Sequence, residues 1–123
     1  MKESILIQKA TEFAILIVEL HKWLTKKKEY EIARQVKRSG TAIGALLCEA
    51  KFAESSADFV HKMRIALKES HETAYWLYLL YKTNYIANNQ YEELINYNTE
   101  LKKMLVASIN TKLNSNNDNS VNS

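Results

Sequence analysis

The chain of 123 residues is long enough for one domain with one hydrophobic core and too short for two. It contains no proline and two glycines, so it lacks the turn residues on which sheet proteins depend, and we expect a nearly all-helical fold. Its formal net charge of +3 is a mild basic excess that nucleic acid or an acidic lipid surface could use, although many proteins without such partners share it.

The first predicted helix spans residues 4–25, with Ser4 as a suitable cap. Apolar residues then recur at alternating spacings of four and three, which is the pattern of a helix that faces a core. This seam contains Leu6, Ala10, Phe13, Ile17, Leu20 and Leu24. Charged residues such as Lys9 and Glu12 interrupt the apolar run, so it resembles neither a signal peptide nor a membrane-spanning helix. We therefore expect a cytoplasmic protein with no membrane partner.

The second predicted helix spans residues 29–53 and follows a polar connection of three lysines. Its seam keeps the four-three spacing of a helical bundle. The seam contains Ile32, Val36, Ser39, Ile43, Leu46, Ala50 and Ala53. Cys48 is the one cysteine, so a disulfide or a multi-cysteine metal site within one chain is excluded, and a reducing location fits. We expect Cys48 to pack as a small buried apolar side chain.

The third predicted helix is the longest and spans residues 56–85. Ser55 and Asp58 stand three positions apart just before an apolar run, the arrangement of a capping box. The seam that follows contains Phe59, Met63, Ala66, Ser70, Thr73, Leu77 and Leu80.

The fourth predicted helix spans residues 90–113, with Asn89 as its cap. Its weaker seam contains Tyr91, Leu94, Asn98, Leu101, Leu105 and Ser108. Residues 114–123 contain one apolar residue. Burial of apolar surface therefore cannot offset the conformational entropy that they would lose on ordering, and we expect a disordered tail rich in asparagine and serine. The bundle domain is then residues 1–113. Helices joined by a few residues run antiparallel to their neighbours, which predicts an up-down-up-down antiparallel four-helix bundle.

Two blocks of the chain, residues 34–52 and 58–80, carry a family pattern. In the second helix the matching residues are Gln35, Arg38, Ser39, Thr41, Ile43 and Glu49. In the third helix they are Asp58, Phe59, Ala66, Leu67, Ser70, Glu72, Thr73, Tyr75 and Leu77. These blocks closely resemble the signature of the 23S rRNA intervening-sequence proteins, small bacterial four-helix bundle proteins encoded within intervening sequences of large-subunit ribosomal RNA genes. Leu46 departs from the pattern, because the family usually has asparagine there, so no role of that asparagine carries over.

The resemblance implies a four-helix bundle that assembles into a ring, usually a homopentamer, without known catalytic activity. A more distant relative in the same structural group is the accessory protein of diversity-generating retroelements, a basic pentameric barrel that binds nucleic acid and a reverse transcriptase. This analogy makes nucleic-acid binding the first functional hypothesis and a protein-interaction module the second.

A charged line on each of two helices flanks the predicted core. Its members are Gln35, Arg38 and Glu49 in the second helix and Glu69 and Glu72 in the third. We interpret them as a structural network in which Arg38 pairs with a carboxylate of the third helix and sets the register of the two helices. A catalytic role for the two carboxylates is the minority alternative, because no nucleophile or oriented general base accompanies them.

A small-residue patch in the second helix predicts the close approach of another helix. Gly40, Thr41 and Gly44 form it, and each glycine costs about 1 kcal/mol of helix stability relative to alanine, which calls for a packing reason. The sequence leaves open whether the approaching helix belongs to the same subunit or to another one.

Metal and cofactor sites are not expected. A di-iron site in a bundle needs two Glu-x-x-His motifs, and the chain has none. The nearest match, Asp58 with His61, is a single copy at a helix start, where a capping aspartate and a solvated histidine are the more common arrangement. We therefore predict a protein without catalytic residues, metal or cofactor.

A basic span connects the first two helices and is the candidate contact with phosphate. It contains Lys22, Lys26, Lys27, Lys28, Arg34, Lys37 and Arg38, with only Glu29 and Glu31 as acids. In a single subunit a solvated loop and helix face is the favoured explanation, because short basic runs are common on protein surfaces. Five copies on the rim of a ring would bind a polyanion without sequence selectivity.

An aromatic cluster near the end of the third helix has two interpretations. It contains Tyr75, Trp76, Tyr78, Tyr81 and Tyr85. Such rings can stack on bases, but amphipathic aromatics are also favoured at subunit interfaces and at bundle ends, which is the more common case.

Overall fold

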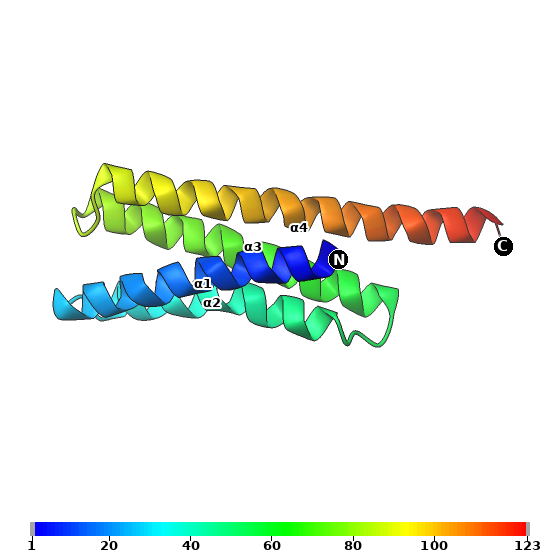
Figure 1. The fold of residues 1–123 in the computed structure, drawn as a ribbon, viewed down its shortest axis with the longest axis horizontal. Helices are drawn as coiled ribbons and strands as arrows, with labels where there is room; N and C mark the ends of the chain where they lie inside the picture. Colours follow the sequence, from blue (N-terminus) through cyan, green and yellow to red (C-terminus); the bar gives the residue numbers. More distant parts are fainter. Residues whose placement is uncertain (1, 123) are drawn as a thin grey trace.

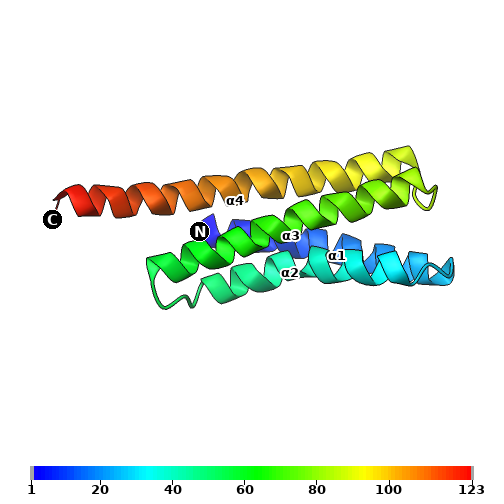
Figure 2. The ribbon, with the colours of Figure 1, turned by 180° about the vertical axis from the view of Figure 1, so that it is seen from behind.

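The structure, a computed structural model, describes the backbone of residues 2–122 and the side chains of residues 5–115. Its four helices are α1 (Lys2–Lys26), α2 (Glu31–Ala50), α3 (Ser56–Lys82) and α4 (Asn88–Asn122). Each helix runs antiparallel to the next one, and α1 and α3 occupy opposite corners of the bundle (Figures 1 and 2). The predicted all-α four-helix bundle is therefore confirmed. Among the described residues, no helix is both long enough and apolar enough to span a bilayer.

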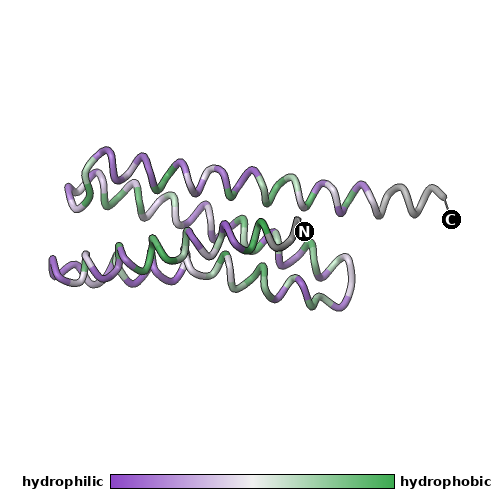
Figure 3. Tube along the Cα trace, in the orientation of Figure 1, coloured by the Kyte–Doolittle hydropathy of each residue, from purple (hydrophilic) through white to green (hydrophobic). Residues whose placement is uncertain are grey.

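The core follows the predicted seams most closely in α1. All six predicted residues of α1 are buried, and Figure 3 shows hydrophobic residues concentrated along this helix. In α2, Ala33 and Leu47 are buried where Ile32 and Leu46 were predicted, and in α3 Val60 is buried where Phe59 was predicted. The three predicted residues are partly buried against the core, because the apolar stripe of each helix is wide enough to include two adjacent positions.

Cys48 lies outside this core. Its side chain is exposed, so the prediction of a buried cysteine is wrong. The orientation of α2 that buries Leu47 turns the next residue towards the outside of the bundle.

The connection between α1 and α2 consists of residues 27–30 and is held by backbone hydrogen bonds. Lys28 has a positive φ of 65°, and the amide of Glu29 donates to the carbonyl of Leu24 at 3.0 Å. This is a Schellman-type helix end in which a lysine takes the position that glycine usually holds. Glu29 then lies before α2 rather than inside it, because its carboxylate accepts hydrogen bonds from the amides of Ile32 and Ala33.

Local hydrogen bonds also mark the start of α3, after the α2–α3 connection, and its end, before the α3–α4 connection. The predicted cap of α3 is confirmed, since the Ser55 hydroxyl accepts from the amide of Asp58 at 3.0 Å. At the end of α3, Asn84 has a positive φ of 67°, and the amide of Tyr85 donates to the carbonyl of Leu80 at 2.9 Å. Helix α3 therefore stops at Lys82, before the predicted residue 85.

Helix α4 is longer than predicted. The sequence pattern placed its end at residue 113, whereas the backbone continues as helix to Asn122 and extends past the other helices (Figure 1). The segment contains no proline or glycine, so no residue in it terminates a helix. The side chains after Ser115 lie outside the described residues, and the disordered character of residues 114–123 remains a prediction.

Two buried polar pairs tie α3 to its neighbours. The Thr73 hydroxyl donates to the Ser39 hydroxyl of α2 at 2.8 Å, and the Ser70 hydroxyl donates to the side-chain oxygen of Asn98 in α4 at 2.8 Å. All four side chains are fully buried, and none in the described residues leaves a buried polar atom without a partner. A slip of one helix would break these bonds in a low-dielectric core, so the pairs fix the register of α2, α3 and α4.

The small-residue patch of α2 packs against α1 of the same chain. A Cβ atom on Gly40 would lie 2.9 Å from both γ-carbons of Ile17, whereas a Cβ atom on Gly44 would meet Ala10 at an ordinary 3.7 Å. Thr41 lies beside them, and its hydroxyl donates to the carbonyl of Lys37 at 2.6 Å. Only Gly40 is therefore required by the close approach of the two helices.

This difference predicts opposite effects for two equivalent substitutions. Gly40→Ala should lower the free energy of unfolding by about 1–2 kcal/mol, because overpacking against the buried, β-branched Ile17 outweighs the gain in helix propensity. Gly44→Ala should raise it by up to about 1 kcal/mol. Urea unfolding at a fixed protein concentration checks both, and a Gly40→Ala variant as stable as the wild type would contradict the close-packing account.

Candidate nucleic-acid interface

The basic span gathers at one end of the bundle. The last turns of α1, the connection and the first half of α2 lie at the end that also carries the α3–α4 connection (Figure 1). All seven predicted basic side chains are exposed, namely Lys22, Lys26, Lys27, Lys28, Arg34, Lys37 and Arg38. The fold therefore presents these charges to solvent on one end of the molecule.

Few acidic partners offset these charges. Lys22 lies 3.5 Å from Glu19, and the ammonium of Lys27 lies over the ring of Trp23, 5.4 Å from its centre. Within the described side chains, five of the seven residues form no ion pair, namely Lys26, Lys27, Lys28, Arg34 and Lys37. The nearest acid in the connection, Glu29, is engaged by the amides that begin α2. The basic span therefore holds more cations than acids, and most of these cations are not ion-paired.

The pKa of His21 is affected by its place beside the basic span. Partial burial lowers the pKa of His21 below its usual value, and the positive charge of Lys37 lowers it further. Burial is thus the main cause of the lowered pKa of His21, and the neighbouring cation Lys37 adds to it.

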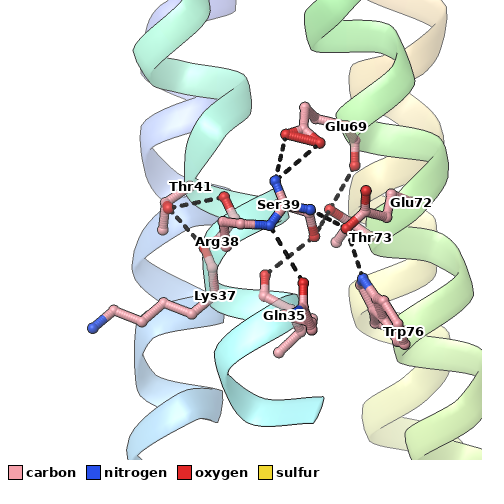
Figure 4. Close-up of polar contacts among 10 residues, drawn as sticks. Gln35, Lys37, Arg38, Ser39, Thr41, Glu69, Glu72, Thr73 and Trp76 are labelled. Carbon is pink, nitrogen blue, oxygen red and sulfur yellow. Dashed lines mark hydrogen bonds and ion pairs between the residues drawn. The ribbon is translucent and has the colours of Figure 1, made fainter. Parts of the chain in front are cut away.

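Arg38 differs from the other basic residues because two carboxylates of α3 surround its guanidinium. Its Nη1 lies 2.9 Å from Glu69, its Nη2 contacts Glu72, and its Nε donates to the Gln35 amide oxygen at 3.4 Å (Figure 4). The hydrogen bond to Glu72 raises the pKa of Arg38. Lys37 extends away from α3, on the opposite side of α2 from Arg38 (Figure 4). Arg38 therefore links α2 to α3 and offers little uncompensated charge to a polyanion.

Trp76 completes this network on α3. Its indole N–H donates to Glu72 at 2.9 Å, and this hydrogen bond, followed by the contact with Arg38, lowers the pKa of Glu72. Glu49 was predicted to belong to the network and does not. It lies about three helical turns beyond Arg38 and is exposed near Lys62, at the other end of the bundle.

The aromatic cluster of α3 separates into two groups. Trp76, Tyr81 and Tyr85 are partly buried and pack against the core, and Tyr81 stacks on Tyr91 of α4 with ring centres 4.7 Å apart. Tyr75 and Tyr78 point outwards instead, with 57% and 47% of their surface exposed. The sequence grouped these rings together, whereas in the structure the first group packs against the core and the second contacts its outer rings, Tyr75 that of Trp76 and Tyr78 that of Tyr91.

An apolar cavity of about 740 Å³ lies at the opposite end of the bundle, where all four helices contribute to its wall. Ile5 of α1, Leu47 of α2, Phe59 of α3 and Met104 of α4 are among the lining residues. Leu47 and Val60, two of the buried positions that differ from the predicted seams, lie at this end. Sequence reasoning did not find this cavity, because a strict four-three pattern assumes that all four helices close around the core.

The described residues contain no group of three histidine, cysteine or acidic side chains that could hold a metal ion. The Asp58 carboxylate accepts from the Lys62 ammonium at 3.0 Å and from the amide of Glu54 at 3.1 Å. These bonds lower the pKa of Asp58, and His61 is exposed. Asp58 acts in the helix cap and in an ion pair.

Comparison with known proteins assigns the family. The family model described as "23S rRNA-intervening sequence protein" matches residues 2–107. The chain belongs to this family. Among curated proteins, none matches the chain.

A solved relative of this 23S rRNA-intervening sequence protein shares its fold. It is a protein of unknown function from the S23 ribosomal protein family of Bacteroides thetaiotaomicron, 48% identical in sequence. The match covers 89% of this chain and 99% of the other one, with a TM-score of 0.87. The relative thus confirms the bundle and the family, and no family of enzymes is indicated.

The Arg38 network predicts a pH dependence in this family member. Because the folded-state pKa of Glu72 is depressed, its stabilising effect is present above the ordinary value near 4.5 and is lost as the pH falls through the folded pKa. Trp76→Phe removes the N–H donor and should raise the pKa of Glu72 towards its ordinary value. Carboxyl NMR titration measures this pKa, with Glu72→Gln to assign the signal, and an unchanged titration in Trp76→Phe would contradict the account.

Proposed function

We propose that the chain forms a non-enzymatic homo-oligomer, a ring of five subunits, that binds nucleic acid weakly and without sequence selectivity. The observation that supports it is the exposed basic end, where the lysines of residues 26–28 have no acidic partner in the described structure and Glu29 is engaged by backbone amides. Phosphate groups supply the missing negative charge. An RNA ligand in the cytoplasm is part of this proposal and rests on these charges, because the family description names an intervening sequence of 23S rRNA and no ligand.

Weak selectivity follows from the type of side chain. Lysine ammonium groups on flexible stems bind phosphate as point charges, whereas base recognition needs planar, bidentate donors held against base edges. Arg38, which has that geometry, already binds Glu69 and Glu72, and Arg34 is the one other arginine among the seven residues. The basic end therefore offers mainly lysine, which suits the nucleic-acid backbone better than its bases.

Self-association is supported by apolar surface that a single subunit leaves uncovered. The cavity between the ends of the four helices is open, and Ile5 beside it is 55% exposed. Ile15 on the outer side of α1 is 57% exposed. Burial of such surface against another copy would stabilise a ring, and five copies would multiply a charge that is modest in one subunit.

A matched pair of double variants tests the basic end. Lys26→Gln with Lys28→Gln should weaken binding of a labelled single-stranded RNA and lower the slope of log K against log salt by roughly 1.4, or about 0.7 per lost phosphate contact. Lys51→Gln with Lys103→Gln removes the same charge from exposed positions elsewhere. Fluorescence anisotropy across a salt series gives both slopes, and equal slopes in the two variants would contradict a site at this end.

The assembly has its own test. Sedimentation equilibrium at micromolar concentration should give about five times the 14.2 kDa mass of one chain. A species of one chain mass would rule out the ring, whatever the result of the binding experiment.

A protein-interaction module is the second candidate. It is favoured by Phe52, which is 85% exposed in the connection after α2, far from the basic end. In that case a partner protein captured from the native host should be retained equally by the wild type and by the Lys26→Gln, Lys28→Gln variant.

A further inference from the structure

The outward side of α3 carries one continuous line of exposed residues. They recur at alternating spacings of three and four, which places them on a single face of the helix over about 30 Å. The line consists of His61, Arg64, Lys68, His71, Tyr75, Tyr78 and Lys82. We call it the α3 line. It contains cationic, imidazole and phenol side chains and no aliphatic residue.

Acidic residues are excluded from the α3 line by the packing of the bundle. All three acids of α3 lie on the flank that faces α2, namely Asp58, Glu69 and Glu72. Each of them is bound to a cation on that flank, Asp58 to Lys62 and the two glutamates to Arg38. Two of these acids pair with Arg38 of α2 and the third pairs within α3, so the outward side carries Arg64, Lys68 and Lys82 and no acid.

The two tyrosines of the line are about half exposed, and each also contacts one neighbouring ring, Tyr75 that of Trp76 with centres 5.3 Å apart and Tyr78 that of Tyr91 with centres 6.4 Å apart. Tyr75 and Tyr78 are 57% and 47% exposed, and within the described side chains their hydroxyl groups form no hydrogen bond. They stand three positions apart, so their rings are neighbours on one helix face. The ammonium of Lys82 lies over the Tyr78 ring, 5.9 Å from its centre, so a base that stacks on this face takes the place of the ammonium.

We propose that the α3 line binds single-stranded nucleic acid. Arg64, Lys68 and Lys82 contact phosphates, and Tyr75 and Tyr78 stack on bases. Interleaved cations and exposed aromatic rings are the combination that sequence-tolerant single-strand binding uses, because every base has a face on which a ring can stack. A duplex hides those faces, so the two tyrosines favour a single strand. This surface is separate from the lysines of residues 26–28 and does not rely on them.

Other occupants fit the α3 line less well. A second copy of the same line would bring like charges together, because no acid in the line offers a complementary group. A lipid surface takes up large aliphatic or tryptophan side chains from an amphipathic helix, and the α3 line has none.

The experiment compares two variants that differ only in ring surface. Tyr75→Ser with Tyr78→Ser should weaken binding of a fluorescein-labelled oligouridine 20-mer at least tenfold, since each stacked base contributes about 1–3 kcal/mol. Tyr75→Phe with Tyr78→Phe keeps the rings and should bind within about threefold of the wild type. Tyr75 and Tyr78 are both exposed, and circular dichroism checks that the two double variants are folded.

Two further binding measurements, with duplex RNA and with lipid vesicles, distinguish a single strand from other ligands. Duplex RNA of the same length should bind the serine variant and the wild type equally, and phosphatidylserine vesicles should not distinguish the variants. Equal binding of oligouridine by the serine variant and the wild type, an equal loss in the phenylalanine variant, or an equal loss on duplex RNA would overturn the proposal. Binding to the vesicles alone would also overturn it.

The same assay distinguishes binding by the α3 line from binding by the lysines of the basic end. The serine substitutions are repeated in the Lys26→Gln, Lys28→Gln background, where the tenfold loss should persist. If the lysine variant binds like its matched control while the tyrosine effect remains, the basic end is wrong and the α3 line is retained. The reverse result retains the basic end alone.

Discussion

The contact between α2 and α3 is the constraint on which the rest of the molecule depends. The buried Thr73–Ser39 hydrogen bond and the exposed Arg38 ion pairs with Glu69 and Glu72 lie side by side on these two helices (Figure 4). Breaking the buried bond would leave a polar group without a partner at a cost of about 1–3 kcal/mol, so the register is strongly specified. That register also decides which charges stay on the surface, because it places the acids of α3 against Arg38.

The distribution of charge on the surface therefore follows from the helix caps and ion pairs that stabilise the bundle. Glu29, Asp58, Glu69 and Glu72 are all engaged in helix caps or ion pairs, whereas most lysines near them are not. The net charge of +3 does not show this arrangement, because these acids lie at helix starts and between α2 and α3 while several cations lie apart from them. Two basic surfaces remain, one at the α1–α2 end and one along the outward side of α3.

Most of the fold could be predicted from the spacing of apolar residues, since α1 buries every residue of its predicted seam. The burial of Leu47 and Val60 in place of Leu46 and Phe59 could not, because both members of each pair lie within one wide apolar stripe and the orientation of the helix against its neighbours decides which is buried. Arg38 was expected to bind a carboxylate of α3, but Glu49 lies too far along α2 to take part. Separating Tyr75 and Tyr78 from the packed rings needed the orientation of α3 against α4, which a one-dimensional pattern does not contain.

The most direct measurement is an NMR footprint of oligouridine on the assembled protein at low salt. Shifted amide signals should map to residues 26–37 and to the outward positions between 61 and 82, and signals near Cys48 and Phe52 should stay unchanged. They should return to their free positions as salt is raised, because phosphate contacts release counterions. Shifts confined to the apolar cavity, or no shift at low salt, would contradict the account that uncompensated lysines and exposed tyrosines bind a nucleic-acid strand.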